Sequence, residues 1–259
     1  MIVDIHNHTV LCNHAQGTID EYILQAIKHG TKTFGFSEHA PMDFDEKYRL
    51  NFHKMDEYET SILDAKEKYK DKIEILLGYE VDYLEGYMDE RVLNANVDYL
   101  IGSVHFIEKW GFDNPEFIGK YEDENIDEIW QKYFNAIEMM AKSRLFDIVG
   151  HLDLIKVFKF MPSKNILDIA KNALIAIKDS DMVIEINMAG YRKPIKEAYP
   201  SLELLQEAFK LDIPITFSSD AHSPEQVSLY ASKIVKLAKD VGYKKCATFK
   251  NRQRKMIDF

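Results

Sequence analysis

Histidine and carboxylate residues occupy the positions of this sequence where chemistry could occur. His6 and His8 stand two residues apart near the start of the chain, and Asp220 and His222 repeat that spacing near its end. Side chains two residues apart on a strand project from the same face, so each pair can direct its donor atoms at one point. Imidazole and carboxylate donors in this arrangement are typical of a site for a divalent transition-metal ion.

Further donors lie at or just past the ends of short apolar runs, in the segments SEH, GYEVD, GSVH and GHLD. Of the nine histidines in the chain, His29 and His53 are instead expected at a helix end and in a loop, outside any site. The nine candidate metal ligands are His6, His8, His14, His39, Glu80, His105, His151, Asp220 and His222.

This number of donors exceeds what one or two ions require. A catalytic zinc ion takes about three protein ligands and keeps one position open, whereas a structural ion takes about four. The donor set therefore predicts about three divalent ions with open positions, and imidazole ligands favour zinc, iron or manganese. The two carboxylates, Glu80 and Asp220, neutralise only part of the charge of such ions. We therefore expect an anionic substrate, for which a phosphate ester is the simplest candidate.

The donors need a scaffold that brings strand ends together. Short β-branched runs alternate with longer segments of helical period, which predicts a parallel sheet closed into a barrel-like single domain over residues 1–259. An open doubly wound sheet is the alternative. In a parallel barrel the functional residues lie at the carboxyl ends of the strands, which is where the candidate ligands fall. The predicted strands are Ile2–His6, Thr33–Glu38, Ile73–Val81, Tyr99–Val104, Asp147–Gly150, Met182–Asn187 and Ile213–Ser218.

Composition and charge exclude several classes of protein. The chain has 259 residues, of which 46% are hydrophobic, and a formal net charge of −10, which argues against coating nucleic acid or anionic membrane. The two cysteines form no CxxC pair, and the sequence shows no signal peptide and no membrane span. We expect a soluble, cytoplasmic protein without nucleic-acid or membrane partners. The basic tail from Lys244 to Phe259 is expected to form a strand and a helix with a solvated face.

The same residues resemble those of a known family. The succession DxHxH, SEH, GYEVD, GSVH, GHLD, EIN and SSDAH is similar to the motifs of the polymerase-and-histidinol-phosphatase (PHP) family. The segments GYEVDYL and EINMAGYRKP further resemble the stand-alone histidinol-phosphate phosphatases. The resemblance implies an α/β fold, the distorted (β/α)7 TIM-like barrel of the PHP type, with a trinuclear metal centre. It also implies hydrolysis of L-histidinol phosphate, in histidine biosynthesis, by a hydroxide that bridges two ions.

The resemblance also implies how the ligands divide among the ions and which residues act on the substrate. One ion would take His6, His8, Glu80 and Asp220, a second would share Glu80 and add His105 and His151, and a third would take His14, His39 and His222. Glu80, Asp220 and His222 are the candidate catalytic residues. The candidate substrate-binding residues, which follow the fifth and sixth strands, are Arg192, Lys193, Asn187 and Lys156.

Two further carboxylates, Asp82 and Asp153, share strand faces with Glu80 and His151, and we expect them to support ligating histidines. Two other functions remain open. A phosphodiesterase or exonuclease would use the same ions but would need a basic groove with stacking aromatic residues. A non-catalytic PHP module would be expected to have lost ligands, whereas the full set is present. The sequence leaves the oligomeric state undetermined.

Overall fold

A parallel sheet that closes nearly into a barrel forms the centre of the molecule. The computed structural model describes all 259 residues, and its sheet has seven strands in the order β1–β2–β3–β4–β7–β8–β9. Ile5 N donates to Phe217 O at 3.2 Å, and Asn7 forms a parallel bridge with Ala221, so the first and last strands meet. This contact confirms the predicted barrel and is not compatible with the alternative, an open doubly wound sheet. The strands are β1 (Val3–Asp4), β2 (Thr33–His39), β3 (Glu74–Asp82), β4 (Tyr99–Ser103), β7 (Ile148–Val149), β8 (Val183–Asn187) and β9 (Ile215–Ser218).

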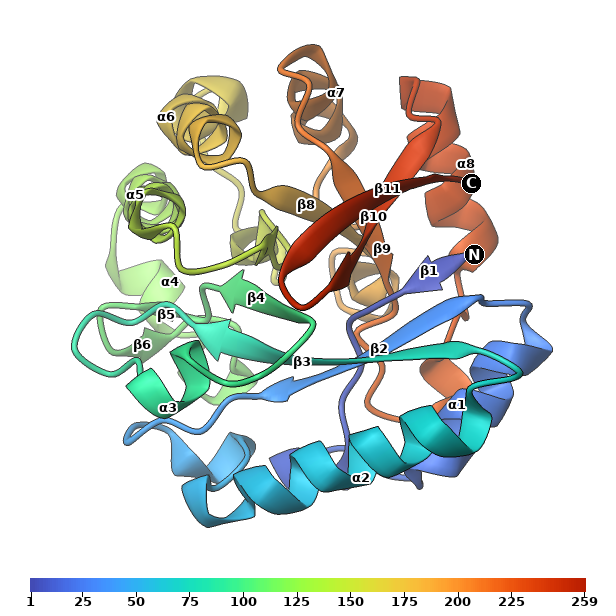
Figure 1. Cartoon of the computed structure of the whole chain (residues 1–259). Coiled ribbons are helices and arrows are strands. Elements are labelled where there is room, and N and C mark those ends of the chain that lie inside the picture. Colours follow the sequence, from blue (N-terminus) through green and yellow to red (C-terminus); the bar gives the residue numbers. More distant parts are fainter.

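Helices surround this sheet and bury their apolar faces against it (Figure 1). The buried residues between helices and strands form one cluster of 51 side chains, which is the larger of the two main cores. Local signals fix where the helices begin and end: Thr18 and Glu21 form a reciprocal capping box at the start of the first helix. The helices are α1 (Ile19–Lys28), α2 (Met55–Tyr69), α3 (Glu90–Leu93), α4 (Lys120–Asp123), α5 (Ile126–Ser143), α6 (Ile166–Asp179), α7 (Leu202–Lys210) and α8 (Ala231–Val241).

The second core includes residues of the inward strand faces, together with residues of α7, α8 and the C-terminal segment. Tyr99 is its largest inward aromatic side chain, and its hydroxyl donates to Phe36 O at 3.1 Å. Glycines make room for this ring, because a Cβ atom at Gly78 would lie 2.6 Å from it and one at Gly35 would lie 2.3 Å from its hydroxyl. This packing closes the barrel below the strand ends that carry the candidate ligands.

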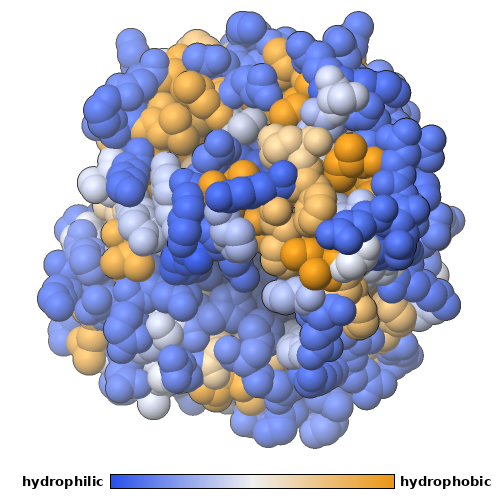
Figure 2. All heavy atoms as spheres, turned by 180° about the vertical axis from the view of Figure 1, so that it is seen from behind, coloured by the Kyte–Doolittle hydropathy of each residue, from blue (hydrophilic) through white to orange (hydrophobic).

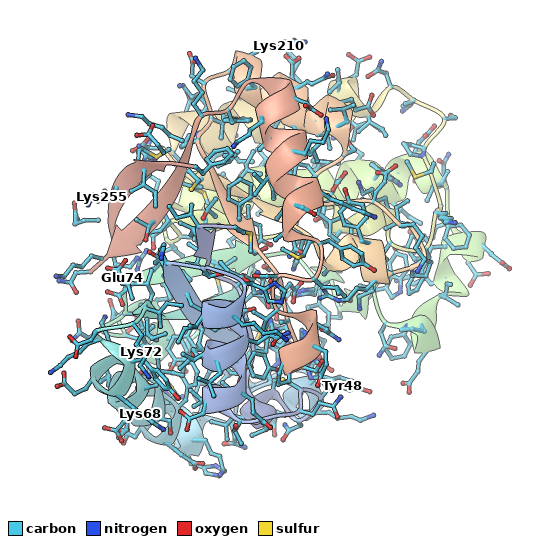
Figure 3. All side chains as sticks on the ribbon, turned by 90° about the vertical axis from the view of Figure 1, so that its right-hand side faces the viewer. Tyr48, Lys68, Lys72, Glu74, Lys210 and Lys255 are labelled. Carbon is cyan, nitrogen blue, oxygen red and sulfur yellow. The ribbon has the colours of Figure 1, made fainter.

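The C-terminal tail forms an antiparallel hairpin of β10 (Lys245–Lys250) and β11 (Gln253–Asp258), so the predicted helix is wrong. Asn251 and Arg252 both adopt positive φ, as a two-residue hairpin turn requires. Cys246, Ala247 and Phe249 are buried in the barrel core, while Arg252 forms an ion pair with Asp147. The hairpin lies across one end of the barrel, and Figure 3 shows Lys255 at that end and Tyr48 at the opposite one.

The opposite end of the barrel is the carboxyl end of the strands. The surface on this side is hollowed near its middle and lined there by hydrophilic residues (Figure 2). An excursion after β4 adds a short antiparallel pair, β5 (Phe106–Ile107) and β6 (Trp110–Gly111). No helix of the structure has both the length and the apolar composition needed to cross a membrane.

Candidate metal centre

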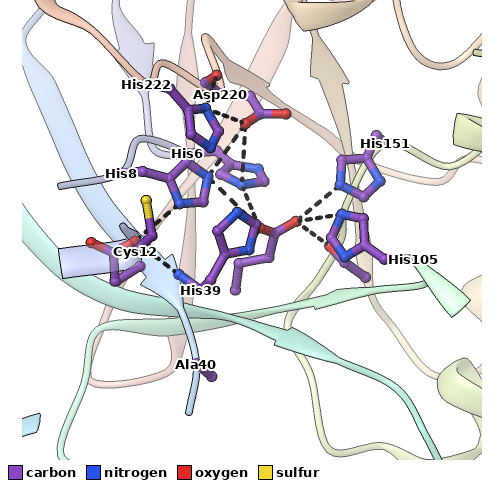
Figure 4. A network of polar contacts seen from close by, with 12 residues as sticks. His6, His8, Cys12, His39, Ala40, His105, His151, Asp220 and His222 are labelled. Carbon is purple, nitrogen blue, oxygen red and sulfur yellow. Dashed lines mark hydrogen bonds and ion pairs between the residues drawn. The ribbon is translucent and has the colours of Figure 1, made fainter. Parts of the chain in front are cut away.

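The side chains predicted as metal ligands converge at the carboxyl end of the barrel (Figure 4). Three groups of donors have ligand atoms that all lie within 4.8 Å of one another. Asp220 approaches the first group, with its Oδ1 3.3 Å from Nε2 of His8. The groups are His6 with His8 and Glu80; Glu80 with His105 and His151; and His14 with His39 and His222. Apart from Asp220, which belongs to none of them, these groups have the same members as the division that the resemblance implied, including the sharing of Glu80.

A fourth group joins Cys12 to His8 and His222, and the sequence did not indicate it. The Cys12 thiol donates to Thr9 O at 3.2 Å. Burial raises the pKa of this thiol, with a further contribution from the nearby Glu38 carboxylate. A thiol must be deprotonated to bind a metal, so Cys12 is a poorer ligand than the histidines beside it.

Carboxylates outside the ligand set orient the ligating imidazoles. The Nδ1 atom of His6 donates to Glu185 at 2.8 Å, and that of His105 donates to Asp82 at 2.6 Å. The Nδ1 atom of His8 lies 3.3 Å from Glu38. In the neutral form of each ring, the Nε2 atom is thereby left as the acceptor that faces the cluster, which is the tautomer a metal ion requires. The predicted support of a histidine by Asp82 is confirmed.

Several buried atoms of this cluster have no hydrogen-bond partner. They are Nε2 of His6, Nε2 of His8, Oε2 of Glu80 and Nδ1 of His151. An unsatisfied buried polar group costs about 1–3 kcal/mol, and buried polar groups in proteins are nearly always paired. The Nε2 atoms of His6 and His8 lie 3.3 and 3.7 Å from Oε2 of Glu80, so a divalent cation fits the space between these three atoms. The residues present therefore fit a metal centre.

The electrostatics of the cluster favour the same occupant. Burial opposes the ionisation of Glu80, yet the adjacent His6 and His39 hold its pKa well below the usual value. The pKa of Asp220 is likewise low, since His6 and His8 outweigh its burial. Burial and the neighbouring charge of His8 lower the pKa of His39 to about 4, so the crowded rings cannot all become cations. Although burial opposes their charge, His105 has its pKa raised to about 10 by Asp82 and Glu80, and His8 has its pKa raised to about 8 by Asp220 and Glu38. Metal binding would therefore displace protons from these rings.

The backbone leaves regular strand geometry where two ligands are presented. His151 has φ +22° and Asp220 has φ +49°, values that non-glycine residues seldom adopt. Beyond β7 the two-residue alternation therefore fails, and Asp153 does not support His151 as expected. Asp153 instead accepts from Ser201 N at 2.9 Å and pairs with Lys156 at 3.0 Å.

Two of the four predicted substrate-binding residues, both basic, line the cavity above the cluster. This space, which we call the metal cavity, measures about 410 Å³ and is lined by Glu80, His151, Asp220, Arg192 and Lys193 among others. Arg192 Nη2 donates to the carbonyl oxygens of Ser219 and Asp220 at 3.0 and 2.7 Å, while its buried Nη1 has no partner. The guanidinium thus keeps hydrogen-bonding capacity that the protein does not use.

The other two residues of that set have different surroundings. Asn187 is fully buried, and its amide donates to Glu185 at 2.8 Å and to Asp220 at 3.1 Å. Lys156 is 1% exposed, and its ammonium group contacts Asp153, Glu197 at 2.8 Å and the Ala198 carbonyl at 2.9 Å. Neither residue lines the metal cavity. Both side chains have their hydrogen-bonding groups engaged within the protein, so the structure gives them supporting contacts instead of a substrate contact.

Lys156 is expected to matter for stability more than for the reaction. Replacing it with methionine removes the cation that compensates the buried Asp153, and breaking a buried pair in this way costs about 3 kcal/mol or more. Urea unfolding of Lys156→Met should show that loss in the free energy of unfolding. The matched control is Lys159→Met. Because Lys159 is exposed, this substitution should change the free energy of unfolding very little. An unchanged free energy of unfolding in Lys156→Met would contradict the stabilising role assigned to Lys156.

Sequence reasoning missed two supporting residues, Glu38 and Glu185, although both stand in the quoted motifs SEH and EIN. Glu185 accepts from the ring of His6, from His151 N at 2.7 Å and from Asn187. Glu38 accepts from Thr9 N at 2.9 Å and from the His8 ring. The sequence pattern could have indicated both residues, because each carboxylate lies in a buried strand that reaches the same end of the barrel as the ligands.

Glu185→Gln is expected to weaken metal binding without removing a ligand. A glutamine amide facing Nδ1 of His6 favours the tautomer whose Nε2 carries the proton, and that nitrogen then cannot bind an ion. We expect metal affinity or activity to fall about 10- to 100-fold. Metal titration followed by calorimetry measures this effect. Glu203→Gln, on the exposed face of α7, serves as the control and should bind metal as the unaltered protein does.

Comparison with known proteins agrees with the geometry. The PHP domain family model matches residues 4–189. A probable histidinol-phosphatase of Deinococcus radiodurans is 36% identical over 257 residues, covering 97% of this chain and 98% of the relative. The histidinol-phosphatase of Bacillus subtilis is 28% identical and covers 86% of this chain and 94% of its own length.

A solved structure shares the fold. It is the histidinol phosphate phosphatase of Lactococcus lactis, described as complexed with zinc, L-histidinol and phosphate. It superposes with a TM-score of 0.80 at 24% identity and covers 98% of each chain. The family match spans most of the chain, and the relative from Deinococcus radiodurans aligns along nearly all of it. On these grounds the protein belongs to the PHP domain family.

Proposed function

We propose that this protein is a metal-dependent phosphomonoesterase that hydrolyses L-histidinol phosphate to L-histidinol and phosphate. The observation that carries the proposal is the convergence of three donor groups in one cavity that also presents Arg192 and Lys193. Metal cations and basic side chains in one cavity suit a phosphate group, because both attract its negative charge. The names of the relatives from Deinococcus radiodurans, Bacillus subtilis and Schizosaccharomyces pombe support histidinol phosphate as the substrate.

About three divalent ions are proposed for the three donor groups. Glu80 would contribute to two of the groups, and Asp220 would complete the group of His6 and His8. Zinc is supported by the ligand named for the Lactococcus lactis structure, while iron and manganese suit the same imidazole donors. When bound, such ions lower the pKa of water to about 7 and neutralise the charge that develops on phosphoryl oxygens.

The chain's own residues would position the ester for in-line displacement. Arg192 lines the metal cavity, and two backbone carbonyl oxygens hold its guanidinium with little remaining freedom. Lys193 adds a second positive charge to the same wall. Asn187 keeps Asp220 oriented, and Glu185 keeps the His6 ring oriented. Groups fixed in this way contribute to catalysis because they need no reorganisation when charge develops.

The direct test is phosphate release by the metal-reconstituted protein. L-Histidinol phosphate would be compared with a panel of other phosphomonoesters and with a nucleotide diester. We expect a strong preference in kcat/KM for L-histidinol phosphate. Broad, weak release from all esters, or a preference for the diester, would overturn the substrate assignment while leaving the metal centre in place.

A further inference from the structure

A second cavity adjoins the metal cavity and lies toward the excursion after β4. We call it the side cavity; its volume is about 300 Å³. The two cavities adjoin, because they share five lining residues: His14, His39, His105, Asp113 and Lys193. A ligand whose phosphate lies over the metal centre can therefore extend into the side cavity.

The lining of the side cavity has more carboxylates than lysine and arginine side chains. Asp45, Asp82 and Asp113 line it, together with the basic residues Arg49 and Lys193. Arg49 is already shared, with its Nη2 3.6 Å from Asp45 and its Nη1 3.0 Å from Asp82. The charge of this wall is therefore not fully compensated from within the protein.

Asp113 is the carboxylate of this wall without a partner. It is half-buried, and it forms neither a side-chain hydrogen bond nor an ion pair in the structure. Its neighbours hold it in place, because Phe112 is fully buried against Tyr133 and Trp110 packs on Tyr121. Asp113 lines both cavities, so its carboxylate lies at the junction between the phosphate end and the side cavity.

Aromatic side chains complete the side cavity. Tyr48, Phe106 and Phe117 line it, and Phe117 is 50% exposed. Tyr48 also packs edge-on against the candidate ligand His14, with ring centroids 5.8 Å apart. Aromatic faces next to a carboxylate suit a flat ring or an alkylammonium group, because both the quadrupole of the rings and the negative charge attract cations.

We propose that the side cavity binds the leaving alcohol of the phosphate ester and selects alcohols that carry a positive charge, with Asp113 as the specificity-determining residue. This inference rests on the proposed function, because it places the phosphate in the metal cavity. L-Histidinol fits the description, since its amine is a cation at neutral pH and its imidazole is a flat ring. Asp45 contributes less, because Arg49 already faces it.

The test measures discrimination between esters. Asp113→Asn keeps the shape of the side chain and removes its charge. Its kcat/KM would be measured for L-histidinol phosphate and O-phosphoethanolamine, whose alcohols are cationic, and for glycerol 2-phosphate, whose alcohol is uncharged. We expect at least about a tenfold loss for the cationic esters, the loss typical of a charged hydrogen bond, and less than about a twofold change for glycerol 2-phosphate. Inhibition by the product L-histidinol should weaken by a similar factor.

Asp43→Asn is the matched control, because Asp43 is exposed and lines neither cavity. It should leave every substrate unchanged. Equal losses for all esters in Asp113→Asn, or no loss for any, would overturn the inference. If the unaltered protein prefers another cationic ester to L-histidinol phosphate and Asp113→Asn abolishes that preference, the proposed substrate fails while the role of Asp113 stands.

Discussion

Glu80→Gln is expected to lower kcat/KM for L-histidinol phosphate by at least about a thousandfold while the barrel stays folded. Glu80 lies where two donor groups meet, with one oxygen 2.9 Å from His151 Nε2 and the other 3.3 Å from His6 Nε2. A neutral amide cannot bridge two cations, so both groups should lose affinity together. Metal analysis should therefore show the loss of about two of the three proposed ions.

The matched control lies on the same strand. Glu74 begins β3 at the opposite end of the barrel, where it is exposed (Figure 3). Glu74→Gln should leave activity and metal content unchanged, and circular dichroism should show both variants folded. Full activity in Glu80→Gln would contradict the metal centre proposed for these donors.

Removal of metal is expected to abolish phosphate release and to lower the melting temperature by about 10 °C. Ligands that bind the folded state at about a thousand times their Kd stabilise it by about 4 kcal/mol, and a protein of this size shifts by about 2–4 °C per kcal/mol. Without ions, the unpartnered atoms of His6, His8 and Glu80 remain buried next to one another. Removal of the ions should therefore lower both the rate of phosphate release and the melting temperature.

The measurement combines dialysis against a chelator, verification of metal content and a thermal melt. Restoring zinc, manganese or iron separately should recover both properties and should rank the three metals by activity. An activity and a melting temperature that both survive verified metal removal would exclude a metal role. Recovery of stability without activity would indicate a metal that fits the donors but does not support the reaction.

The sequence by itself predicted the barrel and the set of candidate ligands. Alternating strands and helices without a long linker leave few folds, and parallel barrels collect their strand ends in one place. Local spacing also decides which face of a strand a residue occupies, which is why His6 and His8 approach the same group. These inferences need only the neighbours of each residue along the chain.

The tertiary structure alone decided what surrounds those ligands. His6 receives its support from Glu185, which lies 179 residues away, and Lys156 finds its partners in Asp153 and the distant Glu197. The partner of Asp153 could not be read from strand alternation, because the backbone departs from strand geometry at His151.

The positions of the hairpin under the barrel and of Asp113 beside the metal cavity could not be predicted from the sequence either. Their positions depend on which strands are neighbours and how the sheet closes. Spacing along one strand specifies a face, whereas contacts between distant segments follow from the packing of the whole chain, and only the folded structure contains that information.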